Sequence, residues 1–461
     1  MGEGFFVLFG AKRIDATKGP IVKLIILYAL PLVISTLIQT LFNAVDVVVL
    51  GNMADSVAVA AVGATTTIVH LLVNTFIGLS SGTKIILAHQ IGAKDHDGVN
   101  KTVGTSLITA VAIGGVIAIV GFFLIPLFLN LTDCPVDCYD GALLYLRIYV
   151  STAPAIMVYN FGSAIISSSG DTQRPMYYIM LCGLLNVFLN VILCLILPQK
   201  VAAVAIATAA AQVLGAFLVM RRLCTMEGIG RVALSKIRWH VSTFGRMMRY
   251  GVPIALSNAL YPMANLQIQT AINSYGVPAI AGNSAAATIE GFSSAFNGAM
   301  GTTTTTFMGQ NLGAENPDRV KKIFWRAWGL CAACSLVMGV FMFLTGRFWL
   351  GLILSDDPSA IDFGMVRMFF ITLFVCVSGS NSVIGHALQA FGYSAFSAAN
   401  SMISIFVLRM IWMFFIYPQY PTFVCLMACF LVSWCFMLLG NILMFLFVYR
   451  RYRRGKLKSI T

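Results

Sequence analysis

The chain has 461 residues, of which 59% are hydrophobic and only 10% are charged. Soluble domains carry roughly a quarter charged residues, so the composition excludes an ordinary soluble protein and predicts a membrane protein. A formal net charge of +13 is also found in proteins that bind nucleic acids. The distribution of the basic residues along the chain argues against such a partner here.

Apolar runs long enough to cross a membrane follow one another along the chain. A hydrocarbon core of about 30 Å requires about 20 consecutive apolar residues in a helical span. We therefore predict an all-α polytopic membrane protein with twelve transmembrane helices, at residues 24–51, 58–87, 101–129, 142–168, 175–197, 200–221, 246–274, 280–309, 321–347, 362–390, 394–417 and 422–449.

Most of the 30 lysine and arginine residues fall on one side of this topology. They precede the first span, join the sixth span to the seventh and follow the last span. Loops on the opposite side carry acids such as Asp137 and Asp357. Cytoplasmic loops are enriched in lysine and arginine, so we expect both termini to be cytoplasmic. The basic character is then explained by topology and contact with the lipid bilayer, and we expect no nucleic-acid partner.

The two halves of the chain resemble each other. The stretch "PLVISTLIQTLFNAV" at 31–45 aligns with "PIALSNALYPMANLQ" at 253–267. Because each copy holds six spans, an even number, both copies enter the membrane from the same side and form a parallel repeat. We predict an N-lobe of residues 1–221, a basic cytoplasmic linker at 222–245 and a C-lobe at 246–461 with a basic cytoplasmic tail. Such repeats are typical of transporters that bind substrate near the membrane midplane.

An aspartate interrupts the apolar run "FNAVDVVVLG" at 42–51 in the first span. An acid at the centre of a membrane helix costs at least about 2.5 kcal/mol on insertion scales, so Asp46 is a functional candidate. A carboxylate without a partner in an apolar environment holds a proton more readily than in water. Steps of three and four residues place Asp46 on one face with Gln39 and Asn43.

Further polar residues recur at helical spacing in other spans, and two explanations stay open. They either form hydrogen bonds between helices or line a water-filled cavity, and their number in both halves favours the cavity. In the N-lobe the candidates are His70, Asn74, Asn186, Asn190 and Thr208; in the C-lobe they are Tyr261, Asn265, Glu290, Asn297 and His386.

Glu290 and Arg409 carry the deep charges of the predicted C-lobe. The charge of Glu290 is suited to attract a cationic substrate. Arg409 is the basic residue in the middle of a span, and it would neutralise Glu290 if the fold brings the two together.

Prolines within the predicted spans remove helical hydrogen bonds and permit bending. Pro31, Pro253 and Pro262 are therefore candidate hinges, although a proline can also form a static kink.

Histidine and cysteine show no pattern of a metal centre. The five histidines are scattered, and most of the eleven cysteines fall inside spans. We therefore expect no enzyme activity and no cofactor. Cys134 and Cys138 fall in an outer loop, where they either form a disulfide or remain free thiols.

Four stretches, in order, resemble the multidrug and toxic compound extrusion (MATE) family of the prokaryotic type over nearly the whole chain. They are "PLVISTLIQTLFNAVDVVVLG", "YNFGSAIISSSGDTQRPMYYIMLCGLLNVFLNVILCLIL", "ATIEGFSSAFNGAMGTTTTTFMGQNLGA" and "QAFGYSAFSAANSMISIFVLRMIW".

The resemblance implies two six-helix lobes around a V-shaped cleft and H⁺- or Na⁺-driven export of organic, often cationic, compounds. By position, the family's N-lobe cation site corresponds to Asp46, Asn186, Asn190 and Thr208, which would hold a proton or Na⁺. Some members have an aspartate where Asn190 stands, so the coupling ion stays open. Members of the NorM branch carry a glutamate in the seventh span, and this chain has none there.

We therefore predict a cation-coupled antiporter that exports organic drugs or metabolites by alternating access. It would be a monomer in a bacterial-type cytoplasmic (inner) membrane. One alternative is a flippase for lipid-linked precursors, whose cavity should be basic to hold phosphates. A channel and a membrane-embedded enzyme are the others.

Overall fold

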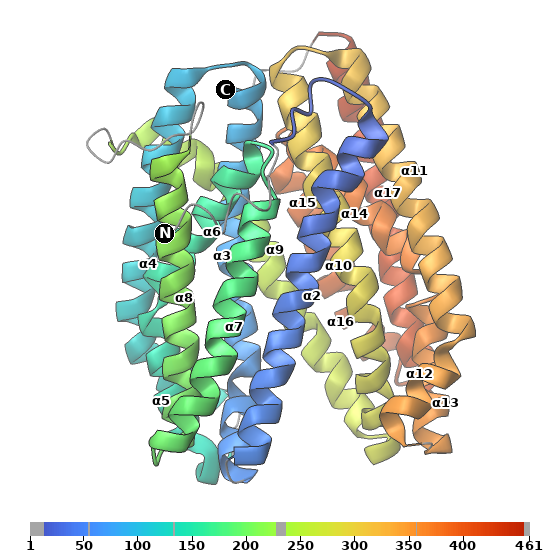
Figure 1. The fold of residues 1–461 in the computed structure, drawn as a ribbon. Helices are drawn as coiled ribbons and strands as arrows, with labels where there is room; N and C mark the ends of the chain where they lie inside the picture. The colour runs from blue at the N-terminus through green and yellow to red at the C-terminus, as the bar shows by residue number, and fades with distance from the viewer. Residues whose placement is uncertain (1–12, 54–55, 132–133, 227–236, 356, 456–461) are drawn as a thin grey trace. The chain divides into compact units, whose positions relative to one another are not determined.

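The computed structural model describes residues 13–53, 56–131, 134–226, 237–355 and 357–455, without the side chains of Asn43, Val47, Ser56 and Leu131. The regular elements of the described residues are helices (Figure 1). They are α2 (Ile21–Met53), α3 (Ser56–Gly92), α4 (His96–Leu131), α5 (Val136–Ser151), α6 (Ala153–Ser168), α7 (Gln173–Ile196), α8 (Lys200–Thr225), α9 (Val241–Asn273), α10 (Val277–Gly313), α11 (Pro317–Leu344), α12 (Gly346–Leu354), α13 (Pro358–Phe370), α14 (Val375–Ala390), α15 (Ser394–Ser401), η2 (Met402–Val407), α16 (Leu408–Ile411), η3 (Trp412–Ile416) and α17 (Phe423–Arg453).

The predicted all-α membrane fold is confirmed. Eight helical segments of the described chain are each long and apolar enough to cross a membrane. Two more spans are bent pairs, α5 with α6 at 48° and α13 with α14 at 43°. The other two predicted spans correspond to α9 and α10, which are 33 and 37 residues long and carry many polar residues.

The two bent pairs have different causes. Pro154 lies at the start of α6, where its missing N–H and its ring favour a break from α5. Between α13 and α14 there is no proline in the sequence. There, the N–H of Leu373 donates to the carbonyl of Met368, five residues back, at 3.0 Å. This wider turn interrupts the helical ladder, as expected of a π-type irregularity.

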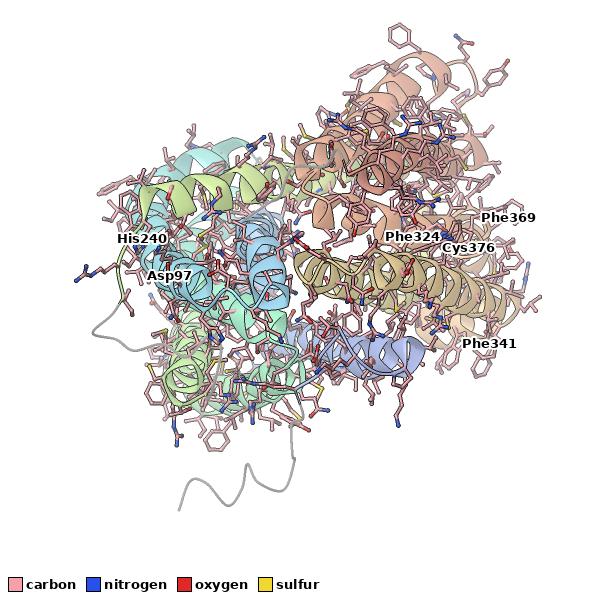
Figure 2. All side chains as sticks on the ribbon, turned by 90° about the horizontal axis from the view of Figure 1, so that it is seen from above. Asp97, His240, Phe324, Phe341, Phe369 and Cys376 are labelled. Atoms are coloured by element: carbon pink, nitrogen blue, oxygen red, sulfur yellow. The ribbon has the colours of Figure 1, made fainter. Side chains whose placement is uncertain are left out.

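Large apolar side chains are exposed along the helices. Phe341 is 58% exposed and Phe369 is 42% exposed, and both lie at the outer rim when the molecule is viewed from above (Figure 2). In water such exposure would be unfavourable, whereas in a bilayer these side chains contact lipid.

The described chain divides into two compact units. Unit 1 comprises residues 1–15 and 30–251, and unit 2 comprises residues 16–29 and 252–461. These units differ from the predicted lobes because the first turns of α2 belong to unit 2 and the first turns of α9 belong to unit 1. The two changes of unit fall beside Pro31 and Pro253, which are equivalent in the repeat, while Pro262 lies further along α9.

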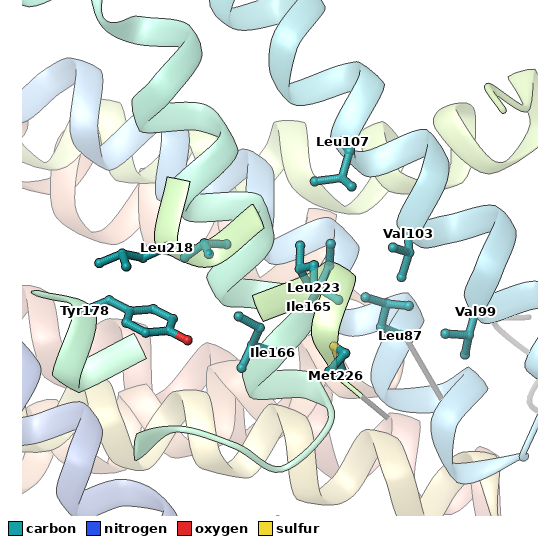
Figure 3. Close-up of a cluster of buried hydrophobic side chains, with 11 residues drawn as sticks. Leu87, Val99, Val103, Leu107, Ile165, Ile166, Tyr178, Leu218, Leu223 and Met226 are labelled. Carbon is teal, nitrogen blue, oxygen red and sulfur yellow. The ribbon is translucent and has the colours of Figure 1, made fainter. Parts of the chain in front are cut away.

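A cluster of buried apolar residues forms part of the core of unit 1 (Figure 3). It joins α3, α4, α6, α7 and α8 through residues such as Leu87, Val103, Ile165 and Leu223. The start of α9 packs nearby at a backbone crossing. A Cβ on Gly82 would lie 2.2 Å from the carbonyl oxygen of Met247, so a larger residue than glycine does not fit. This close approach explains why the first turns of α9 belong to unit 1.

The segment before α2 is anchored within unit 2 by the "GQNLGA" stretch at the end of α10. The side chain of Gln310 accepts a hydrogen bond from the N–H of Ala16 at 3.2 Å, and Asn311 donates to the carbonyl of Ala16 at 3.0 Å. Arg319 donates to the carbonyls of Ala16, Lys18 and Gly19 at 2.7–2.9 Å. These bonds explain why the first turns of α2 belong to unit 2.

Candidate functional site

A chain of hydrogen bonds links the aspartate of α2 to polar side chains of α7 and α8 in unit 1. Nδ2 of Asn190 donates to Oδ1 of Asp46 at 2.5 Å and to Oδ1 of Asn186 at 3.3 Å. Nδ2 of Asn186 donates to Oγ1 of Thr208 at 3.3 Å. The structure therefore brings together the four residues that the family resemblance assigned to one site.

The two asparagines are buried on one face of α7. They are four residues apart, so their side chains lie one above the other, and Asn190 is 0% exposed. Buried amides normally have all their polar atoms paired. Oδ1 of Asn190 is an exception, since it has no hydrogen-bond partner among the described atoms. An acceptor is therefore available beside the carboxylate of Asp46.

The carboxylate of Asp46 has a neutral hydrogen-bond donor and no described counter-charge. No lysine or arginine of the described residues forms an ion pair with it. The described residues also contain no cluster of three or more His, Cys, Asp and Glu side chains. A lone carboxylate surrounded by amide and hydroxyl groups is suited to take up and release a proton or a small cation.

Tyr145 of α5 extends this group and was not predicted from the sequence. It is 8% exposed and lies close to Thr208. A tyrosine near the start of an apolar span carries no sequence signal that separates core packing from a polar site.

The other residues predicted for the N-lobe cavity are separate from the described hydrogen bonds of the Asp46 group, and their cavity role stays a prediction. Gln39 and His70 are exposed, and Asn74 is partly buried. The described hydrogen bonds of the Asp46 group involve none of them. The side chain of Asn43 lies outside the described residues.

Unit 2 holds a cavity of about 420 Å³. Polar residues of the spans now seen as α9 and α10 supply much of its wall. Its polar lining includes Tyr261, Asn265, Gln269, Asn283, Glu290 and Arg367, and its apolar lining includes Phe430 and Trp434.

Glu290 forms an ion pair across this cavity wall, and its partner is not the one considered from the sequence. Its two oxygens accept from Nε and Nη2 of Arg367 at 3.0 and 2.7 Å, and each side chain is 12% exposed. Nη1 of Arg367 donates to Asn283 at 2.6 Å. The question left open by the sequence is therefore answered: Glu290 pairs with Arg367 and not with Arg409. Arg367 lies in the last turn of α13, just before the break between α13 and α14 that has no proline. Nothing in the sequence therefore indicated that this arginine lies beside Glu290.

The described hydrogen bonds of Arg409 are to neutral side chains. Its guanidinium donates to Asn265 at 2.9 Å and to Ser433 at 3.1 Å. It also lies 4.4 Å from the ring centroid of Phe430, within the range of a cation–π interaction. The side chain is 0% exposed.

Asn297 and His386 do not belong to the described cavity lining. Asn297 accepts a hydrogen bond from Ser335 at 2.7 Å and donates to the carbonyl of Val375 at 3.4 Å. Nδ1 of His386 lies 2.8 Å from the carbonyl of Ser382. Asn297 therefore links α10 to α11 and α14, which is the alternative that the sequence left open, whereas the described hydrogen bond of the His386 side chain stays within α14.

Comparison with known proteins gives a consistent result. The MatE family model matches residues 31–192 and again residues 253–415. The chain is 26% identical to the probable multidrug resistance protein YpnP of Bacillus subtilis over 86% of this chain and 89% of that protein. It is 25% identical to the probable multidrug resistance protein NorM of Thermotoga maritima over 84% of each. A crystal structure of MATE in complex with MaL6 superposes with a TM-score of 0.86 at 20% identity, over 97% of this chain and all of that one.

The fold defines a multi-pass membrane transporter with two homologous halves. The double match to one family model begins at Pro31 and Pro253, the same two residues at which the sequence repeat begins. The chain belongs to the MatE family.

Proposed function

We propose that the protein is a cation-coupled antiporter that exports small organic compounds across a bacterial-type cytoplasmic membrane by alternating access. The observation that carries the proposal is the partly buried, hydrogen-bonded carboxylate of Asp46, which has no described ion-pair partner. Two relatives named as probable multidrug resistance proteins support export of organic compounds.

We take a proton as the coupling ion. The amide N–H groups of Asn190 point to Asp46 and Asn186, and its one unpaired oxygen would supply only a single further ligand to Na⁺, which requires several oxygen ligands. With Asp46 protonated, the same amide can turn so that its oxygen accepts the new O–H. Rotation of one side chain amide would then accompany each protonation event.

Alternating access needs hinges, and the positions of two prolines support hinge roles. Pro31 and Pro253 each lie within two residues of a change of unit along a continuous helix. Since a proline leaves one carbonyl of the preceding turn without its helical bond, bending there disrupts few interactions. Pro262 lies inside unit 2 and would bend α9 within that unit.

The coupling role of Asp46 is tested in proteoliposomes under separately imposed H⁺ and Na⁺ gradients, with efflux of ethidium, an organic cation, and of 2-naphthoate, an organic anion, as the readouts. Asp46→Asn should abolish gradient-driven efflux while the protein stays folded. Asp318→Asn is the matched control, because Asp318 is an exposed acid in the first turn of α11. Full efflux by Asp46→Asn would refute the assignment.

A further inference from the structure

Arg409 is a buried charge without a counter-charge in the described structure. It is 0% exposed, and it forms none of the ion pairs found among the described residues. Its Nη2 has no hydrogen-bond partner there. Burial of an uncompensated charge inside a membrane protein is costly and is typical of a functional position.

The backbone around Arg409 is irregular on both sides. The residue lies in the single α-helical turn of α16, between the π-helical segments η2 and η3. π-Helical turns are rare and are found frequently at functional sites. Two of them within one membrane span mark this turn independently of its charge.

Three residues that contact Arg409 also line the cavity of unit 2. They are Asn265, which accepts its hydrogen bond, and the rings of Phe430 and Tyr261, whose centroids lie 4.4 and 6.0 Å from the guanidinium carbon. The guanidinium therefore lies directly behind the cavity wall. Within the cavity, Glu290 and Arg367 cancel each other's charge, so Arg409 leaves the region net positive.

We propose that the cavity of unit 2 binds the anionic group of an organic substrate, a carboxylate or a phosphate, with Arg409 as its counter-charge. Because the guanidinium is 0% exposed and lies behind the wall, a wall side chain turns aside when the anion accepts from Nη2. The flat apolar part of the substrate packs against Phe430 and Trp434. The cavity of about 420 Å³ is within the range of small-molecule sites. Arg367 is less suited to be the counter-charge, because Glu290 already balances its charge and three of its five N–H groups are engaged by Glu290 and Asn283. As a statement about the exported substrate, this inference rests on the proposed function.

Binding is measured without any gradient, by titrating the purified full-length protein in lipid nanodiscs with 2-naphthoate, 1-naphthyl phosphate and 2-naphthamide. The amide matches the carboxylate in shape but carries no charge. A charge-assisted hydrogen bond corresponds to about a 10-fold to 100-fold difference in affinity. We expect at least one of the anions to bind about 10-fold or more tightly than the amide. Equal affinity of all three probes, or absence of anion binding, would overturn the proposal.

Two variants separate a binding role from a structural role. Arg409→Gln should remove the preference for anions and leave amide binding unchanged. Asn265→Asp keeps the arginine and supplies it with a fixed carboxylate at the position of the present hydrogen bond, so it should abolish the preference without loss of folding. A preference that persists in Asn265→Asp refutes the role of Arg409 even if Arg409→Gln does not fold.

A third variant distinguishes this inference from the proposed function. Asp46→Asn should lose gradient-driven efflux and retain the anion preference, because Asp46 belongs to unit 1 and the cavity to unit 2. Efflux without the anion preference would leave the antiporter proposal standing and refute the anion site.

Discussion

Both oxygens of Glu290 accept hydrogen bonds from Arg367, so the negative charge of this acid is already neutralised where it lines the cavity of unit 2. The role considered from the sequence, attraction of a cationic substrate, depends on an uncompensated charge. In the structure the uncompensated charge near this cavity is positive and belongs to Arg409. The pair of Glu290 and Arg367 is better understood as a structural link between α10 and α13.

If this pair is structural, its loss should appear in stability. Glu290→Gln leaves Arg367 buried without its counter-charge, and breaking a buried pair from one side costs roughly 3–5 kcal/mol. The thermal unfolding midpoint in detergent should fall clearly. The double variant Glu290→Gln/Arg367→Gln should recover much of the loss. A single variant as stable as the parent would contradict the structural role.

A second prediction concerns the coupling ion. Asn190→Asp places a second carboxylate against Asp46, where the amide nitrogen is now 2.5 Å away. Two adjacent acids repel each other unless a cation or proton lies between them. Efflux by this variant should therefore depend on added Na⁺ more strongly than efflux by the parent. The measurement is efflux from proteoliposomes over a series of Na⁺ concentrations at fixed pH. Asn186→Asp provides the comparison one turn away, and an unchanged Na⁺ response of Asn190→Asp would argue against cation binding here.

The sequence was sufficient for the fold because helical membrane spans leave a strong local signal. Each predicted span has a matching helix or bent pair, and the repeat beginning at Pro31 and Pro253 recurs in the family match. The group around Asp46 was assigned by resemblance to a family, since spacing alone shows which face a residue occupies but not which helix faces it.

Features that depend on contacts between distant segments were not predictable. The partner of Glu290 lies 77 residues away, on a helix that breaks without a proline. The π-helical turns around Arg409 have no recognisable sequence pattern. The assignment of the first turns of α2 to unit 2 depends on hydrogen bonds between Ala16 and residues nearly 300 positions later. Local periodicity contains no information of this kind.

The anchor of the amino-terminal segment leads to a third prediction. Arg319→Ala removes the hydrogen bonds to three carbonyls, so the segment at 16–29 should open more often. Hydrogen–deuterium exchange followed by mass spectrometry should show faster exchange in these residues. Arg326→Ala is the matched control, because Arg326 is exposed on the same helix. Equal exchange in the two variants would show that Arg319 does not hold the segment.

The hinge proposal gives a fourth prediction, which separates motion from binding. Pro31→Ala and Pro253→Ala restore a backbone N–H at the points where α2 and α9 change unit, so each helix becomes stiffer there. Both variants should transport ethidium more slowly at saturating substrate, while their equilibrium affinity for ethidium stays near that of the parent. Pro126→Ala is the matched control, because Pro126 lies inside α4 and away from either change of unit. Should all three variants transport equally fast, Pro31 and Pro253 are static kinks. Should Pro126→Ala slow transport as much as the others, helix stiffness in general limits the rate, and the two junctions have no special role.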